Sequence, residues 1–366
     1  ETQRVFEDDL KQAMNLAFAP DGTLFVVCAK EILALHDRDG DGRCEAKTRV
    51  LRLETPNSNP HGQLLALTHS HDGWIYTSRG NIGSADYRFI GAEGAEISGG
   101  GEGGEIVRLR TDGSGLQRVA TGFWNPFDLR FDFKGRLLCV DNDPDSRGPN
   151  RLLHIVPGGD YGYRARYGGS GLHPYDAWEG DLPGTLPMIA GVGEAPSAVL
   201  DLSQTGFPDD YGQGILVTVW GEHNLTLYEP KQSGVSITAT GKPFITGGQD
   251  FRPVALAPAP DGSVFITDWV LKDYPNHGRG RIWRLALKAG GQGRQPRSTL
   301  SKPEADEAFA VFEKLGSTEQ DKLEDIKQGL HSGDSFLHTA ALQSLASPGF
   351  HATARAWLTS EDTALR

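Results

Sequence analysis

The sequence predicts an all-β fold, a β-propeller, followed by a small α-helical segment at the C-terminal end. Three observations predict it. Glycine is abundant, one strand-turn-strand phrase recurs along the chain, and the apolar periodicity becomes helical from about residue 303. Glycine occurs 47 times in 366 residues, between short apolar runs, which is typical of turn-rich β proteins.

The recurring phrase is an alternating strand, a turn that contains glycine, and a second strand rich in β-branched and aromatic residues. Glycine supplies the positive φ of a tight hairpin turn. The five copies span 16–29, 65–78, 129–142, 199–220 and 254–268. A third strand follows each copy and a fourth follows several, as in propeller blades, which repeat every ~40–50 residues. Residues 1–286 therefore predict five readable blades, with a row of stacked sandwiches as the alternative.

The ends of the predicted propeller indicate how the ring closes. The last blade has no fourth strand, and residues 2–8 (TQRVFED) resemble the fourth-strand phrase QRVATGF. We therefore expect the first segment to complete the last blade, so that no strand edge stays open. A sixth blade, if the ring has one, lies upstream of residue 1.

The last part of the chain predicts a second unit. Residues 287–302 are rich in Gly, Pro and Ser and are predicted to be a linker. Residues 303–366 place apolar residues three and four apart, which is typical of amphipathic helices. The last helix resembles a HEAT-type helix, so we expect a HEAT-like repeat that continues beyond this chain.

Composition excludes several classes of function. The formal net charge of −12 argues against nucleic-acid binding, which needs clustered Lys and Arg. No run approaches the ~20 apolar residues of a membrane-spanning helix. The chain begins at Glu1 with no basic-then-apolar leader, which indicates a processed or shortened product. Cys28, Cys44 and Cys139 form no metal or haem pattern, and Cys28 and Cys139 are predicted to be buried thiols.

An acidic loop lies within residues 35–47. Asp37, Asp39, Asp41 and Gly42 match positions 1, 3, 5 and 6 of an EF-hand calcium loop, and Glu45 falls at position nine. The flanking sequences read as strands, so the prediction is a Ca²⁺-binding turn between two outer strands, with a structural role. The alternative is a solvated polar turn.

A second acidic loop, VDNDPDSRGPNR, spans 140–151 and contains Asp141, Asp143 and Asp145. It follows the second strand of its blade, where loops border the central channel of a propeller. A metal site and an Asx-rich turn are equally compatible with its composition.

Polar and aromatic residues stand beside the inner strands of several predicted blades. Such positions converge on one pocket, which is the strongest indication of a site. His61 precedes an inner strand at the channel mouth, although a lone histidine is more often structural. The candidates are His61, Trp124, Asn125, Glu194, Ser197, Gln249, Asp250, Arg252, Asp268, His277, Arg279 and Arg281.

With these motifs in view, the chain resembles a known group. The phrases are NPHGQLLAL, GFWNPFDLRF, VDNDPDSRGPN, VPGGDYGY and HGRGRIWRL. The chain is similar to the soluble glucose and sorbosone dehydrogenase superfamily of six-bladed pyrroloquinoline quinone (PQQ) propellers. More closely, it resembles planctomycete proteins described as membrane-bound dehydrogenases, which join such a propeller to HEAT repeats and often a cytochrome c domain. The resemblance covers residues 1–285 and, more weakly, 303–366.

The resemblance implies a periplasmic or secreted dehydrogenase that oxidises a sugar or alcohol and passes electrons to a cytochrome c. His61 matches the family base that takes the substrate hydroxyl proton, and Asn125 matches a cofactor contact. Trp124 stands where the family has Arg, Phe127 stands where it has Gln, and the family Lys that binds the quinone has no counterpart.

The resemblance implies Asn125, Arg279 and Arg281 as cofactor contacts, and the positions beside the predicted blades add Trp124, Arg252 and Asp268. The resemblance also implies a calcium loop at Asn142, Asp143 and Pro144, to which the acidic composition of the loop adds Asp145. Two other functions stay open at this point. A calcium-dependent lactonase would use Asp143, Glu194 and Asp268. A glycan- or partner-binding propeller would use Trp124, Trp220 and Trp269 as a stacking surface.

Overall fold

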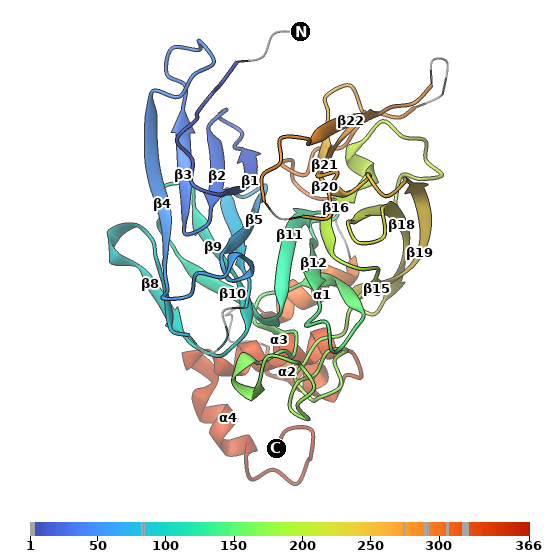
Figure 1. Ribbon diagram of the computed structural model, residues 1–366. Coiled ribbons are helices and arrows are strands. Elements are labelled where there is room, and N and C mark those ends of the chain that lie inside the picture. The colour runs from blue at the N-terminus through green and yellow to red at the C-terminus, as the bar shows by residue number, and fades with distance from the viewer. Residues whose placement is uncertain are drawn as a thin grey trace.

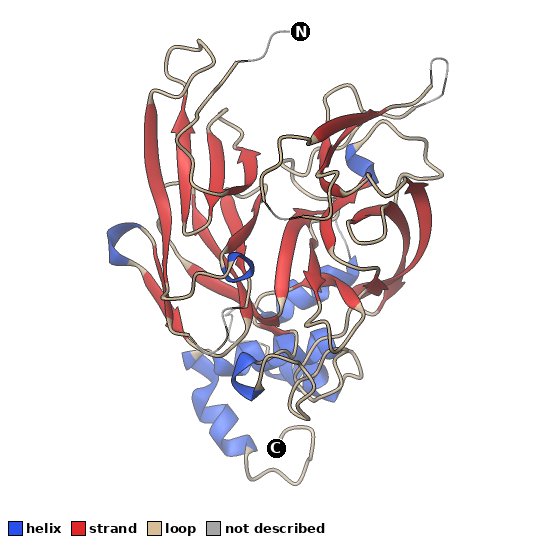
Figure 2. Ribbon diagram, in the orientation of Figure 1, coloured by secondary structure: helices blue, strands red, loops and turns tan. Residues whose placement is uncertain are grey.

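The computed structural model describes residues 4–366 except 82, 84, 274, 289, 290, 292, 305–306 and 317–321. Strands make up most of its regular structure, and α-helices occur only towards the C-terminal end of the described chain (Figure 2). The strands form five sheets, and nearly all of their pairings are antiparallel.

The inner strands of the five sheets follow one another along the chain (Figure 1), although the first and second sheets also take strands from within the stretch of the next sheet. In spatial order, the first contains β1 (Ala13–Phe18), β2 (Leu24–Cys28), β3 (Glu31–His36), β4 (Ala46–Glu54), β7 (Tyr87–Ile90) and β8 (Glu96–Gly99). The second contains β14 (Gly159–Asp160), β10 (Gln117–Phe123), β9 (Gly104–Arg110), β6 (Trp74–Arg79) and β5 (Leu64–His69). The third contains β11 (Asn125–Phe131), β12 (Leu137–Asn142), β13 (Asn150–Ile155) and β15 (Ala190–Val192). The fourth contains β16 (Pro196–Asp201), β17 (Ile215–Val219), β18 (Asn224–Ser233) and β19 (Ser236–Thr246). The fifth contains β20 (Pro253–Pro258), β21 (Val264–Asp268) and β22 (Arg281–Leu285).

Each sheet begins with one copy of the recurring phrase, and the first strands of successive sheets pack against one another. β1 contacts β5, β5 contacts β11, β11 contacts β16, and β16 contacts β20. Apolar side chains fill the space between neighbouring sheets, with one layer between the third and fourth and another between the fourth and fifth. The sheets of the described chain are thus arranged around their inner strands in a propeller-like fold.

The glycine turns and the bulges show that the sheets are equivalent. Gly22, Gly73, Gly135 and Gly262 have φ between +82° and +89°, as the tight turns require. Gly214, in the looser fourth copy, does not have a positive φ. The inner strand of every sheet carries a register shift near its start, at 13/15, 64/67, 126/128, 196/198 and 253/255. Bulges of this kind redirect side chains at a strand end.

The ring is open between the fifth and first sheets, and β1 and β22 lie on opposite sides of the opening in Figure 1. Exposed apolar side chains mark both sides: Leu16 and Phe18 of β1 are 56% and 62% exposed, and Phe265 and Ile282 of the fifth sheet are 40% and 72% exposed. The inner strands of the second to fourth sheets are mostly buried. Within the part of the chain that the structure describes, the first and last sheets therefore each lack a neighbouring sheet on one face.

The predicted closure by residues 2–8 is wrong for the residues that the structure describes. Cys44 donates a backbone hydrogen bond to the oxygen of Phe6 (3.0 Å), and Glu7 pairs with Lys47 (3.0 Å). Phe6 also packs beside Val26 and Leu35. The segment lies on the first sheet because a nearby apolar surface accepts Phe6, and β22 keeps an unpaired edge.

The helical unit packs on the face of the propeller that carries the β11–β12 and β18–β19 turns. Its helices are α1 (Glu307–Gly316), α2 (Leu323–His331), α3 (Ser335–Ala346) and α4 (His351–Trp357), joined by the 3-10 turn η5 (Pro348–Phe350). Asp334 caps α3, accepting from the backbone N–H of Phe336 (2.9 Å), and its other oxygen accepts from the N–H of Val235 (2.9 Å). Phe312, Ile326 and Phe336 join the apolar cluster that contains residues of the second and third sheets.

Residues 293–304, which lie within the predicted linker and just after it, form backbone hydrogen bonds with the propeller. Arg297 N–H donates to the oxygen of Ser203 (2.9 Å), and Glu304 N–H donates to the oxygen of Phe133 (3.1 Å). Cys28 and Cys139 are buried free thiols, as predicted. No helix in the described residues is long and apolar enough to cross a membrane.

Candidate functional site

The inner strands begin, and the second strands end, at one face of the ring, which we call the mouth. Strand pairing fixes this placement, because Leu64 pairs with Arg79, Asn125 with Asn142, and Pro253 with Asp268. His61, Trp124, Asn125, Asn142, Asp143, Pro144, Asp145, Arg252, Asp268, Arg279 and Arg281 all belong to these strand ends or their adjoining loops. The site residues predicted beside the channel thus come to the same face.

His61 lies in the 3-10 turn η1 (Pro60–Gly62), directly before β5. Its Nδ1 lies 2.9 Å from the side-chain amide of Asn125, the first residue of β11. In the amide orientation that satisfies both groups, Asn125 Oδ1 accepts from Nδ1–H of His61, and Nδ2 donates to the oxygens of His61 (2.8 Å) and Trp124 (3.0 Å). Asn125 is buried and His61 is exposed. The contact therefore selects the tautomer in which Nε2 is the basic nitrogen.

Gly80, the residue after β6, makes this contact geometrically feasible. A Cβ at Gly80 would lie 1.7 Å from the backbone oxygen of His61 and 2.5 Å from the side-chain amide of Asn125. Any side chain would displace the His61 turn, because real Cβ atoms do not approach so closely. Sequence reasoning missed Gly80, and its only signal was a glycine directly after a second strand.

An aromatic wall stands next to Asn125. The rings of Trp124 and Tyr163 meet edge to face, with centroids 5.1 Å apart at 83°. Asn81 N–H donates to the oxygen of Trp124 (2.7 Å), and its Nδ2 donates to the Tyr163 hydroxyl (3.2 Å). Burial raises the pKa of Tyr163 above its usual value, so its hydroxyl stays protonated at neutral pH. Tyr163 and Asn81 were not predicted, because they lie in loops outside the repeats.

Asp141 of the second acidic loop is no metal-ligand candidate, since it forms a buried ion pair. Its Oδ2 lies 2.5 Å from the Arg151 guanidinium, and both side chains are fully buried. Burial raises the pKa of Asp141 to about 6, although Arg151 acts in the opposite direction. Asn142 Nδ2 donates to the oxygen of Pro196 (3.0 Å), which ties the third sheet to the fourth. These contacts hold the start of the loop rigidly.

The rim formed by the third and fourth sheets is acidic. Asn150 accepts from the backbone N–H of Asp143 (2.8 Å) and donates to Glu194 (3.3 Å). Glu194 N–H in turn donates to the carboxylate of Glu222 (3.1 Å). Burial raises the pKa of Asp143, which is half-buried. Asp143, Glu194 and Glu222 thus form a chain of carboxylates along one side of the mouth, and Glu222 had not been predicted.

Asp268 organises the rim of the fifth sheet. Its Oδ1 accepts from the backbone N–H of Arg252 (2.8 Å), and its Oδ2 accepts from Trp283 Nε1 (2.9 Å) and lies 3.2 Å from the Arg281 guanidinium. The Arg252 guanidinium lies over the ring of Trp220, 4.5 Å from its centroid. Asp268 is buried and uses both oxygens, so its role here is to hold Arg252 and Arg281.

Arg281 also faces a cavity of about 520 Å³ beside the last blade. Asp250, Phe251, Trp283 and Leu285 contribute to its lining. The lining also includes Gln249, in the loop that leads into the inner strand β20. Arg279 is exposed on the loop before β22.

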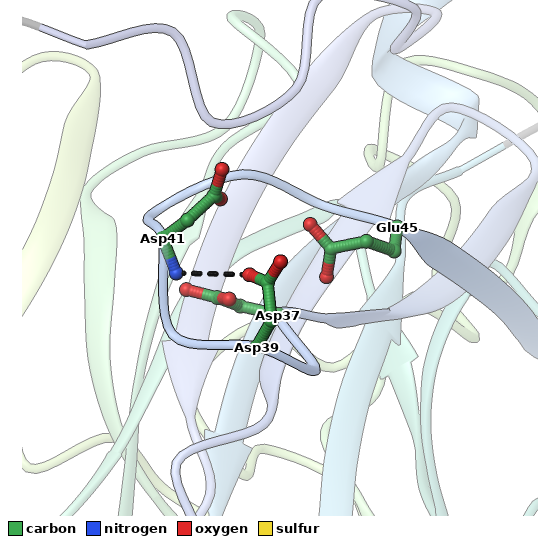
Figure 3. Close-up of side chains that lie close together, drawn as sticks. All are labelled: Asp37, Asp39, Asp41 and Glu45. Atoms are coloured by element: carbon green, nitrogen blue, oxygen red, sulfur yellow. Dashed lines mark hydrogen bonds between the residues drawn. The ribbon is translucent and has the colours of Figure 1, made fainter.

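The first acidic loop connects β3 to β4, at the end of the first sheet opposite the mouth. Ligand oxygens of Asp37, Asp39, Asp41 and Glu45 lie within 4.8 Å of one another, and all four side chains are exposed (Figure 3). Both oxygens of Asp37 accept backbone hydrogen bonds, from Gly40 (2.7 Å) and Gly42 (2.9 Å). The predicted convergence of four carboxylates is present, away from the mouth.

The residues at the mouth fit a quinone tricarboxylate on the side of the fifth sheet. Arg252 Nε is buried and has no hydrogen-bond partner in the described part of the chain. Arg279 adds an exposed guanidinium in the loop between β21 and β22 of the same sheet. The acidic rim of the third and fourth sheets, with Asp143 and Glu194, repels carboxylates unless a cation lies between them.

Comparisons with known proteins give partial matches. Residues 1–156 match a family model described as a domain of unknown function, DUF7133. No curated protein matches. Among solved structures, the chain is similar to the PQQ-bound form of an aldose sugar dehydrogenase from Streptomyces coelicolor, at 19% identity and a TM-score of 0.44, over 78% of this chain and 97% of that one. It is also similar to the soluble aldose sugar dehydrogenase of Escherichia coli in its apo form, at 14% identity and a TM-score of 0.44, over 78% and 99% of the two chains. A third is a structure titled glucose dehydrogenase, at 16% identity and a TM-score of 0.45, over 77% and 99%.

Proposed function

We propose that this chain is the propeller of a periplasmic or secreted quinoprotein-type dehydrogenase that oxidises a sugar or alcohol, with His61 as the general base. The observation that carries the proposal is the His61–Asn125 contact. A base must be positioned and in the correct tautomer before it can take a proton. Asn125 meets both needs, because it holds Nδ1–H and is itself fixed by backbone oxygens.

Each residue of the mouth has a role in this proposal. Nε2 of His61 accepts the proton of the substrate hydroxyl, while Gly80 keeps the His61 turn close to Asn125. Trp124 and Tyr163 form an apolar wall that excludes water on one side. PQQ, when bound, would accept the hydride from the substrate carbon.

The same proposal assigns the charged residues. Arg252 and Arg279 would hold the carboxylates of PQQ. Asp268 would fix the backbone of Arg252, and Arg281 would pair with Asp268. Ca²⁺ would bind at Asn142, Asp143, Pro144 and Asp145, where a cation offsets the acidic rim. A second Ca²⁺ would bind at the loop that connects β3 to β4, as a structural ion.

Three further parts of the proposal concern the whole protein. A cytochrome c would accept the electrons. A sixth sheet would lie in the opening between the fifth and first sheets, where Leu16 and Ile282 are exposed. The C-terminal helices would belong to a HEAT-like array.

A calcium-dependent lactonase is the second candidate, and the acidic rim favours it. Asp143 and Glu194 lie on adjoining loops that Asn150 connects, as metal ligands of a hydrolase would. Asp268, which was also considered for this role, has both oxygens occupied.

Reconstitution separates the two candidates. The full chain is mixed with PQQ and Ca²⁺, and oxidation of aldoses and alcohols is followed with an artificial electron acceptor. Oxidation that requires PQQ supports the dehydrogenase. Hydrolysis of lactones with Ca²⁺ alone, and no oxidation with PQQ, supports the lactonase instead.

A further inference from the structure

A loop outside the mouth carries three aromatic rings in mutual contact. The ring of Tyr167 stacks on that of His173, with centroids 4.7 Å apart and planes at 12°. Tyr175 contacts both, at 5.6 and 5.3 Å. Tyr167 is 40% exposed and Tyr175 is 64% exposed. The rings therefore pack against one another while leaving apolar surface open to solvent, as binding surfaces do.

The same loop is fastened to the mouth. Arg166 N–H donates to the oxygen of Gly101, in the loop before β9 (3.1 Å). Arg147, in the loop after β12, donates to the oxygen of Asp176 (2.9 Å). Tyr163 joins Trp124 at the start of the loop. The three rings thus lie at the rim of the mouth, between the loops of the second and third sheets.

A carboxylate with an unused acceptor accompanies the rings. Asp176, directly after Tyr175, is only 5% exposed. Its Oδ1 accepts from the backbone N–H of Arg164 (2.7 Å), and its Oδ2 is buried without a hydrogen-bond partner in the described residues. Leaving a buried acceptor without a partner is unfavourable, and a donor on a ligand would offset this.

This pairing of exposed rings with an unsatisfied carboxylate matches the chemistry of a sugar ring. One face of a pyranose consists of C–H groups that pack on an aromatic ring, and its edge carries hydroxyl donors. An acidic polysaccharide is disfavoured, because the chain has a net charge of −12.

We propose that Tyr167, His173, Tyr175 and Asp176 form a subsite for one pyranose ring of a neutral oligosaccharide. The other end of the oligosaccharide reaches the mouth, so the substrate is a chain of sugars rather than a free monosaccharide. The assignment of a sugar as substrate rests on the proposed function, whereas the subsite itself rests on the contacts of this loop.

Binding without turnover tests the subsite. Isothermal titration uses the full chain carrying His61→Ala, without PQQ, and three neutral probes: cellohexaose, xylohexaose and mannohexaose. We expect at least one hexasaccharide to bind, and Tyr175→Ala or Tyr167→Ala to weaken that binding about tenfold. Tyr175→Phe should retain most of it. Tyr211→Ala is the matched control, because Tyr211 is 38% exposed and contacts Phe244 in the fourth sheet.

The outcomes are distinct. If none of the three hexasaccharides binds, or if the Tyr175→Ala variant with native circular dichroism binds as tightly as its parent, the subsite is overturned. If a hexasaccharide binds through Tyr175 but the reconstituted protein oxidises no sugar, the subsite stands and the proposed dehydrogenase fails.

Discussion

His154 of β13 stacks on Phe336 of α3, with ring centroids 5.5 Å apart and planes at 24°. His154 Nδ1 lies 3.0 Å from the hydroxyl of Ser236, and the imidazole is fully buried. Burial, and secondarily the nearby positive charge of Arg136, lowers the pKa of His154 to about 3. A neutral imidazole therefore joins the helical unit to the propeller.

This contact predicts a pH dependence of stability. The unfolded chain binds a proton at His154 below its ordinary pKa of 6.5, and the folded chain does so only near 3. Burying the neutral ring therefore contributes fully to the free energy of unfolding above pH 6.5. This contribution is lost as the pH falls towards 3. Between pH 7 and pH 5 the loss amounts to about 2 kcal/mol. In urea denaturation, the free energy of unfolding of His154→Leu should therefore differ less between pH 7 and pH 5 than that of the wild type. An equal difference in the two proteins would contradict the prediction.

Gly80→Ala should lower the activity of the reconstituted protein more than about 100-fold while the sheets stay folded. The added methyl group would lie 1.7 Å from the His61 oxygen, so the His61 turn must move and small misplacements are costly. Gly333→Ala is the control, because nothing lies within 4 Å of its Cβ position. Activity near wild type for Gly80→Ala would show that the His61 turn has no catalytic role.

Asn125→Ala should lower kcat roughly tenfold or more and change KM little, because His61 loses the partner that sets its tautomer. Asn125→Asp should shift the acid limb of the pH–rate profile upwards, since a carboxylate stabilises the imidazolium. Steady-state kinetics across pH 5–9 measure both effects. Identical profiles for the Asp variant and the wild type would remove Asn125 from the mechanism.

Calcium should stabilise the β3–β4 turn. Adding Ca²⁺ to the chelated protein is expected to raise the unfolding temperature by a few degrees, and Mg²⁺ should do less. Asp39→Asn and Glu45→Gln keep the shape of the side chains and should reduce the shift. Glu179→Gln, an exposed carboxylate elsewhere, serves as the control. A shift of the same size in all three variants would place the ion elsewhere.

The five sheets could be predicted because each is built from local hairpins with a turn glycine, as at Gly73 and Gly262. The positions of His61 and Asn125 beside inner strands could be predicted for the same reason. The ring closure was predicted wrongly. The resemblance of residues 2–8 to a fourth strand ignored the apolar surface around Val26 and Leu35, which lies closer in the chain and takes Phe6.

Other parts of the site could not be read from pattern. Gly80, Asn81 and Tyr163 matter through contacts between different sheets, and no spacing in the sequence records such contacts. Likewise, Asp141 looked like a loop carboxylate until its pairing with Arg151 placed it in the interior. The rings of Tyr167 and Tyr175 lie in an insertion without periodicity, where sequence alone indicates only a loop.

In the proposed function, His61 is the base of a PQQ-dependent oxidation. The most direct measurement is the rate of sugar oxidation by the full chain reconstituted with PQQ and Ca²⁺, for the wild type, His61→Ala and the control His71→Ala. His71 is exposed in the β5–β6 turn, at the face opposite the mouth. We expect kcat to fall about 100-fold or more for His61→Ala and to stay near the wild-type value for His71→Ala. Equal rates for His61→Ala and wild type would contradict this assignment.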